Sequence, residues 1–352
     1  MKIHVQRLGQ SLLLAGLIAC WGEVLMEQAL AKRPFLVRTP RGMDTVRRTH
    51  TPSNTILEET EGSQSKFTYL ENPDRDVWVF DTRSVSPTNP DERQFQQIKI
   101  RRFLQTHQKE KSHWNDSTLD EFWETFEEEV PLIVLVHGNY TSTTEAIESA
   151  NMLENRLFPG AGPFATAKYR LLIWAWPADT VYKRHLPDAK LKGYYSIKQG
   201  EYLAQLLALA PEGSRISLVG FSFGARTTCE AVQRLSEHAA ASLQIRNLLL
   251  SPAIDQFSLA PRSRYGNVLA VSQQSIVLFN PRDFALWFYP SLTGCGGPKS
   301  LGREGLPGLP VELRNKITGI NIRKIADKQH SFVVFFRDPN LNRKLGEYLL
   351  FE

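Results

Sequence analysis

The feature that most constrains the fold is residues 216–224 (ISLVGFSFG), where an apolar run leads directly into two glycines that flank one serine. The run is rich in β-branched and apolar residues, which is typical of a buried strand. Behind it, Ala225, Cys229 and Val232 recur at helical spacing, so a helix is expected at once. A strand-to-helix turn this tight leaves no room for side chains beside the serine, which explains the glycines. The stretch therefore predicts strand, sharp turn and helix, with Ser222 at the turn.

A serine at such a turn is held in a strained backbone conformation that lifts its hydroxyl clear of the sheet, as in a nucleophile elbow. A serine hydroxyl is a poor nucleophile at neutral pH, so it needs a general base, and the base needs an acid to orient it. Two histidines follow Ser222 in the chain, His238 and His330. His238 falls near the far end of the expected helix, roughly 20 Å along its axis from the serine. His330, just after the last expected strand, is therefore the candidate base.

Two aspartates are candidates for the acid, Asp283 and Asp255. Each comes just past the end of an expected strand, where open α/β sheets place their sites. Asp283 is preferred because its strand is nearer in sequence to the His330 loop. Asp255 remains the alternative acid, or a turn cap after Pro252.

An oxyanion hole is expected where residues 137–139 (HGN) end a strand that should neighbour the strand before Ser222. The backbone N–H groups of Asn139 and of Phe223, the residue after the serine, are the candidates. His137 itself is interpreted as a residue that braces this loop.

The rest of the chain alternates between strand and helix patterns. Strands are expected near residues 77–80, 98–101, 131–136, 169–174, 245–250, 275–279 and 317–322, and helices after residue 142, at 196–210 and at 340–350. Repeated units of this kind predict an α/β fold with a mainly parallel sheet covered on both faces. The Gly/Pro-rich residues 294–310 are expected to form a long loop, either a lid or a surface excursion.

The N-terminus has the pattern of an export signal. Residues 1–20 combine Lys2 and Arg7 with an apolar core that is too short to span a bilayer. The sequence LIAC resembles a bacterial lipobox, which makes Cys20 a lipidation candidate and predicts membrane anchorage through an N-terminal lipid; cleavage after Ala31 is the rival. These features predict an exported protein of the periplasm or cell envelope. Polar residues 21–65 are expected to be a linker, and residues 66–352 the folded domain.

Composition excludes some classes of function. With 42% apolar and 10% aromatic residues the chain is globular. Its formal net charge is +5, and its Lys and Arg residues are scattered, so no nucleic-acid partner is expected. The three cysteines form no C-x-x-C and no pairing with His, so neither a disulfide framework nor a zinc site is indicated. The expected reaction needs neither a metal nor a cofactor. The oligomeric state is left open.

Six stretches, VLVHGNYTS, WAWPAD, SLVGFSFGAR, LLLSPAID, FNPRDFAL and QHSF, resemble in order and spacing a bacterial branch of the α/β-hydrolase superfamily. The resemblance implies an α/β-hydrolase fold with a mostly parallel, about eight-stranded sheet. It also implies a triad of Ser222, Asp283 and His330 that hydrolyses an ester-like bond in a small-molecule substrate. Phe221 and Phe223 depart from the His and the Met or Leu that are usual beside the serine.

These observations together predict a serine hydrolase that forms an acyl-enzyme on Ser222. Two alternatives remain open, namely a serine peptidase on the same fold and a non-catalytic cell-envelope binding protein that retains it. Four aromatic residues are candidates to line an acyl site, although aromatics near strand ends more often belong to the core. They are Trp176, Trp287, Phe288 and Tyr289.

Overall fold

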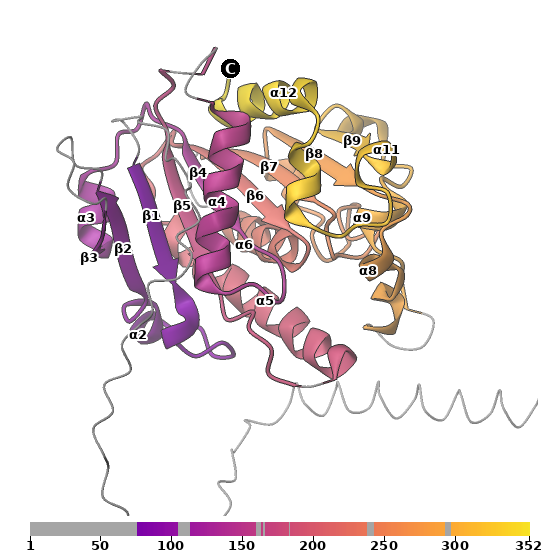
Figure 1. Cartoon of the computed structure of the whole chain (residues 1–352), viewed down its shortest axis with the longest axis horizontal. Helices are drawn as coiled ribbons and strands as arrows, with labels where there is room; N and C mark the ends of the chain where they lie inside the picture. Colours follow the sequence, from indigo (N-terminus) through magenta and orange to yellow (C-terminus); the bar gives the residue numbers. More distant parts are fainter. Residues whose placement is uncertain are drawn as a thin grey trace, which may run out of the picture. The chain divides into compact units, whose positions relative to one another are not determined.

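The computed structural model describes residues 76–104, 113–159, 163–164, 166–182, 184–237, 243–292 and 297–352. These residues form one nine-stranded sheet with the order β3-β2-β1-β5-β4-β6-β7-β8-β9 (Figure 1). The strands are β1 (Asp76–Asp81), β2 (Lys99–Leu104), β3 (His113–Ser117), β4 (Leu132–Val136), β5 (Arg170–Ala175), β6 (Arg215–Phe221), β7 (Gln244–Leu250), β8 (Gln274–Phe279) and β9 (Ile317–Asn321). Neighbours pair in parallel except β1 with β2 and β2 with β3.

The predicted fold class is confirmed, and the sheet has one strand more than the eight expected. The additional strand is β3, which pairs only with β2 at the edge of the sheet. Its sequence, HWNDS, is polar and none of its residues is fully buried. An edge strand of this kind has no alternation of apolar and polar residues, so its sequence gives no strand signal.

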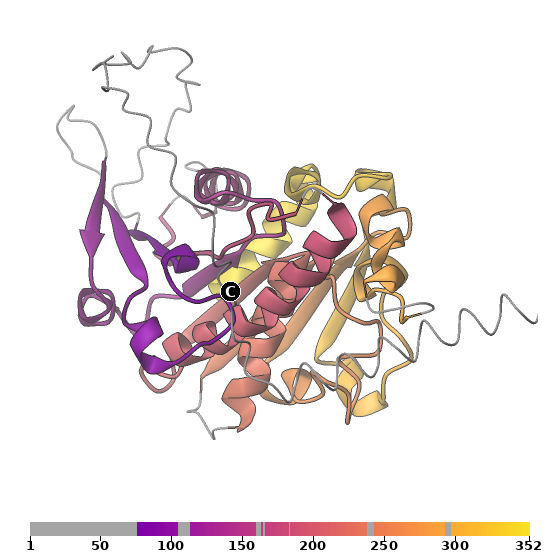
Figure 2. The ribbon, with the colours of Figure 1, turned by 90° about the horizontal axis from the view of Figure 1, so that it is seen from below.

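Helices cover both faces of the sheet. The α-helices are α2 (Glu92–Phe95), α3 (Leu119–Glu124), α4 (Thr143–Leu157), α5 (His185–Leu207), α6 (Phe223–Glu237), α7 (Val268–Val271), α8 (Phe284–Trp287), α9 (Leu301–Glu304), α10 (Val311–Arg314), α11 (Arg323–Ala326) and α12 (Pro339–Leu350). Short 3₁₀ helices are η1 (Thr82–Ser84), η2 (Tyr289–Ser291) and η3 (Phe332–Phe336). Helices α5 and α6 pack together on one face, and α4 and α12 pack together on the other (Figure 2).

The strand β4 shows why the core has two halves. Its five residues are all buried and alternate between the two faces. Leu132, Val134 and Val136 join the apolar cluster under α5 and α6, whereas Ile133 and Leu135 join the cluster under α4 and α12. A strand covered on both faces reads as a continuous apolar run, which is why the sequence predicted this strand so clearly.

The order of strands also fixes where a site can form. From β4 the chain crosses to β5 on one side and then returns to β6 on the other side of β4. A crevice opens at such a switch point, beyond the carboxyl ends of the strands. The loop after β4 and the turn after β6 meet there.

Two expected segments differ in the structure. Helix α5 begins at His185 instead of residue 196, with Pro187 in its first turn, a position where proline is tolerated. The described part of residues 294–310 contains α9 and packs against the segment that follows β7. The backbone N–H groups of Leu301 and Gly302 donate to the carbonyls of Ile254 and Pro252 at 2.8 and 3.0 Å.

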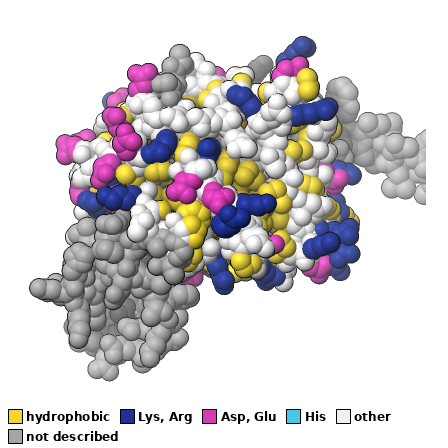
Figure 3. All heavy atoms as spheres, turned by 90° about the horizontal axis from the view of Figure 1, so that it is seen from above, with side chains coloured by type: hydrophobic (Ala, Val, Ile, Leu, Met, Phe, Trp, Pro, Cys, Tyr) yellow, Lys and Arg dark blue, Asp and Glu magenta, His cyan; other side chains and the backbone are white. Residues whose placement is uncertain are grey.

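The predictions for residues 1–65, including Cys20, lie outside the described residues and stay predictions. Within the described ranges, no helix is both long and apolar enough to cross a bilayer. On the face drawn in Figure 3, the described Lys and Arg side chains lie among acidic, apolar and uncharged ones instead of gathering into one basic patch.

Candidate active site

Ser222 occupies a sharp turn between β6 and α6, and its backbone φ is +55°. Only glycine enters this region freely, so a serine here is strained, as nucleophile elbows require. The flanking glycines are needed for space. A Cβ on Gly220 would lie 2.5 Å from Cα of Ala225, and one on Gly224 would clash with the backbone oxygen of Val136. The Ser222 residue remains 7% exposed.

His330 lies beside this serine. Its Nε2 is 3.0 Å from Ser222 Oγ, and its Nδ1 is 2.7 Å from Asp283 Oδ2. A carboxylate accepts but does not donate, so the proton between them belongs to Nδ1 of the imidazole. Nε2 is then free to accept the serine proton, which is the tautomer that a general base needs.

The carboxyl group of Asp283 is held from both sides. It follows β8 and caps α8, because its Oδ1 accepts a hydrogen bond of 3.0 Å from the backbone N–H of Leu286. Its Oδ2 accepts from His330, and the side chain is fully buried. A carboxylate fixed in this way fixes the imidazole in turn.

Asp255, the alternative acid, is placed elsewhere. Its Oδ1 accepts a 2.8 Å hydrogen bond from the hydroxyl of Tyr289, and that hydroxyl accepts one of 2.8 Å from Nη2 of Arg226. Its backbone pairs with Ser300 in an isolated bridge. The structure therefore brings Asp283, and not Asp255, to His330.

The two candidate oxyanion donors come from the expected elements. Phe223 is the first residue of α6, where backbone N–H groups have no partner inside the helix. Asn139 belongs to the loop after β4, whose Gly138 lies so close that a Cβ there would be 3.3 Å from Cβ of Ser222. The parallel pairing of Val136 with Gly220 brings this loop to the serine.

His137 in the same loop has both ring nitrogens occupied. Nδ1 is 2.8 Å from the carbonyl of Gly138, and Nε2 accepts from the backbone N–H of Trp176 at 3.2 Å. Burial lowers the pKa of His137 to about 3, so the ring is neutral at physiological pH. This geometry is that of a loop brace, which matches the interpretation from sequence.

Sequence reasoning missed one supporting residue. The centroid of the Phe221 ring lies 5.0 Å from that of the His330 imidazole. The rings of Phe332 and Phe335 pack against Phe221, with centroids 5.8 and 5.7 Å from that of Phe221. Phe221 therefore gives the imidazole an apolar wall. The only signal in the sequence was its departure from the residue usual beside the serine.

The four aromatic candidates for an acyl site separate into two pairs. Trp176 and Tyr289 are buried in the core, whereas Trp287 and Phe288 are 55% and 47% exposed. Among the residues that the structure describes, no three His, Cys, Asp or Glu side chains are grouped so that they could hold a metal ion.

The fold and the site define an α/β hydrolase, and a family comparison agrees. The family described as "Alpha/beta hydrolase of unknown function (DUF900)" matches residues 115–295, just over half of the chain. The chain belongs to this family, and the resemblance drawn from sequence is confirmed. The match includes Ser222 and Asp283, and His330 lies beyond it. No curated protein matches the chain significantly.

Three of the solved structures that this chain matches serve as examples. An esterase from Pyrobaculum calidifontis is 13% identical, with 72% of this chain and 80% of that chain covered and a TM-score of 0.33. A putative hydrolase from Agrobacterium vitis S4 is 12% identical, covering 75% and 96%, with a TM-score of 0.34. A carboxyl esterase from the fungus Tuber melanosporum is 10% identical, covering 82% and 89%, with a TM-score of 0.38.

Proposed function

We propose that this hydrolase is a serine esterase that forms an acyl-enzyme on Ser222. The observation that carries the proposal is the pair of contacts made by His330, 3.0 Å to Ser222 Oγ and 2.7 Å to Asp283 Oδ2. One imidazole thus links a strained serine to a buried carboxylate, which is the arrangement that acyl transfer requires.

Each residue then has a defined part in the reaction. Ser222 Oγ attacks the ester carbonyl while His330 Nε2 accepts its proton, and Asp283 stabilises the imidazolium that forms. The N–H groups of Phe223 and Asn139 donate to the oxyanion of the tetrahedral intermediate. His330 protonates the leaving alcohol, and later activates the water that releases the acid from Ser222.

The test is labelling with a fluorophosphonate, which reacts only with an activated serine. We expect the purified protein to be labelled on Ser222 and to hydrolyse short p-nitrophenyl esters. Labelling without ester hydrolysis, together with cleavage of peptides, would favour a serine peptidase. An unreactive Ser222 would favour a non-catalytic binding protein on this fold.

We also retain export as a proposal that rests on residues 1–20 alone. Intact-mass measurement on protein from native cells tests it. A start at Met1 would exclude export, and an unlipidated start at Lys32 would exclude only lipidation of Cys20.

A further inference from the structure

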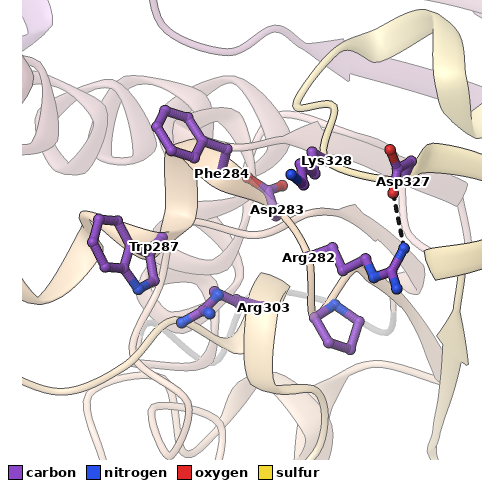
Figure 4. Close-up of a pocket in the computed structure, with 8 residues that line it drawn as sticks. Arg282, Asp283, Phe284, Trp287, Arg303, Asp327 and Lys328 are labelled. Carbon is purple, nitrogen blue, oxygen red and sulfur yellow. Dashed lines mark hydrogen bonds and ion pairs between the residues drawn. The ribbon is translucent and has the colours of Figure 1, made fainter.

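A cavity of about 740 Å³ opens beside the buried carboxyl group of Asp283 (Figure 4). This volume lies within the range of sites that bind small molecules. The lining residues are Pro281, Arg282, Asp283, Phe284, Trp287, Arg303, Asp327 and Lys328. They come from the loop that carries Asp283, from α8 and α9, and from the two residues that precede the His330 loop.

Three basic and two acidic side chains contribute to this lining. Arg282 Nη1 is paired with Asp327 Oδ1 at 3.0 Å, and both side chains are more than half exposed. Asp283 is already committed to His330 and to the backbone of α8. Among the described residues, Lys328 has no ion pair. A positive charge therefore remains without a partner in the cavity.

Arg303 adds a donor that lacks an acceptor. Its Nε has no hydrogen-bond partner within the described chain, which is rare for a buried N–H group, but this atom is enclosed. The side chain as a whole is 28% exposed, so the other guanidinium nitrogens are the donors available to a ligand. Its nearest described carboxylate is that of Glu304, 3.6 Å from Nη1, and Glu304 also lies 3.5 Å from Lys299. A carboxylate or phosphate oxygen is the acceptor that a guanidinium prefers.

One side of the cavity is apolar. Phe284 and Trp287 are 60% and 55% exposed, and their rings stack with centroids 6.4 Å apart. Figure 4 shows them on the same side as Arg303, with the Arg282–Asp327 pair on the other side. A ligand that covers these rings and also reaches the basic side chains has an apolar part next to an anionic group.

We propose that this cavity binds the anionic group, a carboxylate or a phosphate, of an ester whose carbonyl is attacked by Ser222. The inference rests on the proposed function and names its substrate class. The cavity shares Asp283 with the site, and Lys328 is two residues from His330 in the sequence, so the cavity lies next to the acid and the base of the triad.

The test compares mono-p-nitrophenyl adipate with p-nitrophenyl heptanoate, a neutral ester of similar length. We expect a kcat/KM ratio that favours the adipate ester. In the double variant Arg303→Gln, Lys328→Gln this ratio should fall about tenfold, mainly through KM, which corresponds to about 1.4 kcal/mol. The control is the double variant Arg323→Gln, Lys324→Gln, which removes the same two charges from exposed residues of α11 outside the cavity and should keep the ratio. An unchanged ratio in the double variant overturns the inference and leaves the serine mechanism intact.

A binding measurement keeps the test independent of catalysis. We expect adipate and inorganic phosphate to bind the Ser222→Ala protein in calorimetry, and to lose binding when Arg303→Gln and Lys328→Gln are added. If neither ester is hydrolysed, this loss still supports the anion site, while absence of binding overturns it. Binding only to vesicles of an anionic phospholipid, and to neither free anion, would overturn the assignment to a small-molecule ester.

Discussion

Asp283 and Asp255 follow neighbouring parallel strands, β8 and β7, at the same edge of the sheet, yet they belong to different polar networks. Asp283 binds His330, whose other nitrogen contacts Ser222. Asp255 binds Tyr289, which in turn accepts a hydrogen bond from Arg226.

The difference is that the first network ends at a serine hydroxyl, whereas the second ends at backbone carbonyl groups, although its Asp255 and Arg226 are partly exposed. Ser222 and the side chain of His330 are 7% and 17% exposed, so a substrate can meet the hydroxyl at the end of the chain. Arg226, in contrast, donates from Nε and Nη2 to the backbone carbonyl of Ala253 at 3.1 and 2.8 Å, and from Nη1 to that of Gly193 at 3.4 Å. Burial also raises the pKa of Tyr289, which keeps its hydroxyl protonated as a donor to Asp255. A network that ends at backbone carbonyl groups stabilises the fold, and one that ends at a hydroxyl is available for chemistry.

The largest expected effect is at Ser222, where the network of Asp283 and His330 ends. Ser222→Ala should lower turnover of p-nitrophenyl butyrate by about 10⁴-fold or more, because the nucleophile is lost while the fold is kept. Ser251→Ala is the matched control, since Ser251 is buried, directly follows β7 and also has a positive φ, of 38°. It should leave turnover nearly unchanged. Fluorophosphonate labelling that persists in Ser222→Ala would remove this serine from the mechanism.

The acids give the second prediction. Asp283→Asn should lower kcat by about 10⁴-fold, because an amide no longer holds His330 in the required tautomer. Asparagine caps a helix as well as aspartate does, so the melting temperature should change little. Asp255→Asn should keep most of the turnover. Steady-state kinetics and thermal melts of both variants check this, and an inactive Asp255→Asn protein with an active Asp283→Asn protein would reverse the assignment.

Sequence reasoning predicted most of the fold because most strands are covered on both faces. The five buried residues of β4 and the strand that precedes Ser222 are recognisable without any tertiary information. Strand β3 is polar and lies at the edge, and the first turns of α5 carry few apolar residues, so neither was predicted.

The candidate site was predictable in part for a similar reason. The turn that holds Ser222 is a local structure, dictated by the glycines around it. The choice between Asp283 and Asp255 depends on where two loops fold in space, and the sequence offered only the nearness of one strand to His330 and the family resemblance of the stretch FNPRDFAL. The apolar wall made by Phe221 is also a tertiary contact, formed with residues more than 100 positions away.

The network of Asp255 gives the third prediction. Tyr289→Phe should lower the free energy of unfolding by about 2 kcal/mol, because it leaves Asp255 and Arg226 without their shared partner. Turnover should fall far less than in Asp283→Asn. Tyr194→Phe, at a residue 46% exposed, is the control and should change stability by less than about 0.5 kcal/mol. Urea denaturation measures both, and a Tyr289→Phe protein of unchanged stability would contradict the structural role.

The smallest expected effect concerns His137, whose two ring nitrogens both contact backbone groups, unlike those of His330. Burial lowers the pKa of His137 to about 3, whereas the unfolded chain titrates near its ordinary value of 6.5. Between these two pKa values His137 binds a proton in the unfolded state but not in the folded state. The free energy of unfolding therefore falls as pH drops from 6.5 toward 3. Between pH 7 and 5.5 this contribution amounts to about 1 kcal/mol.

Urea denaturation at these two pH values measures the effect. The loss of the free energy of unfolding should be smaller by that amount in His137→Gln than in the unmodified protein. His185→Gln, at an exposed residue, should retain the original pH dependence. An equal loss of stability in His137→Gln and in the unmodified protein would contradict this prediction. It would mean that His137 has the same pKa in the folded and the unfolded protein, and that its burial and its contacts with Gly138 and Trp176 do not keep it neutral.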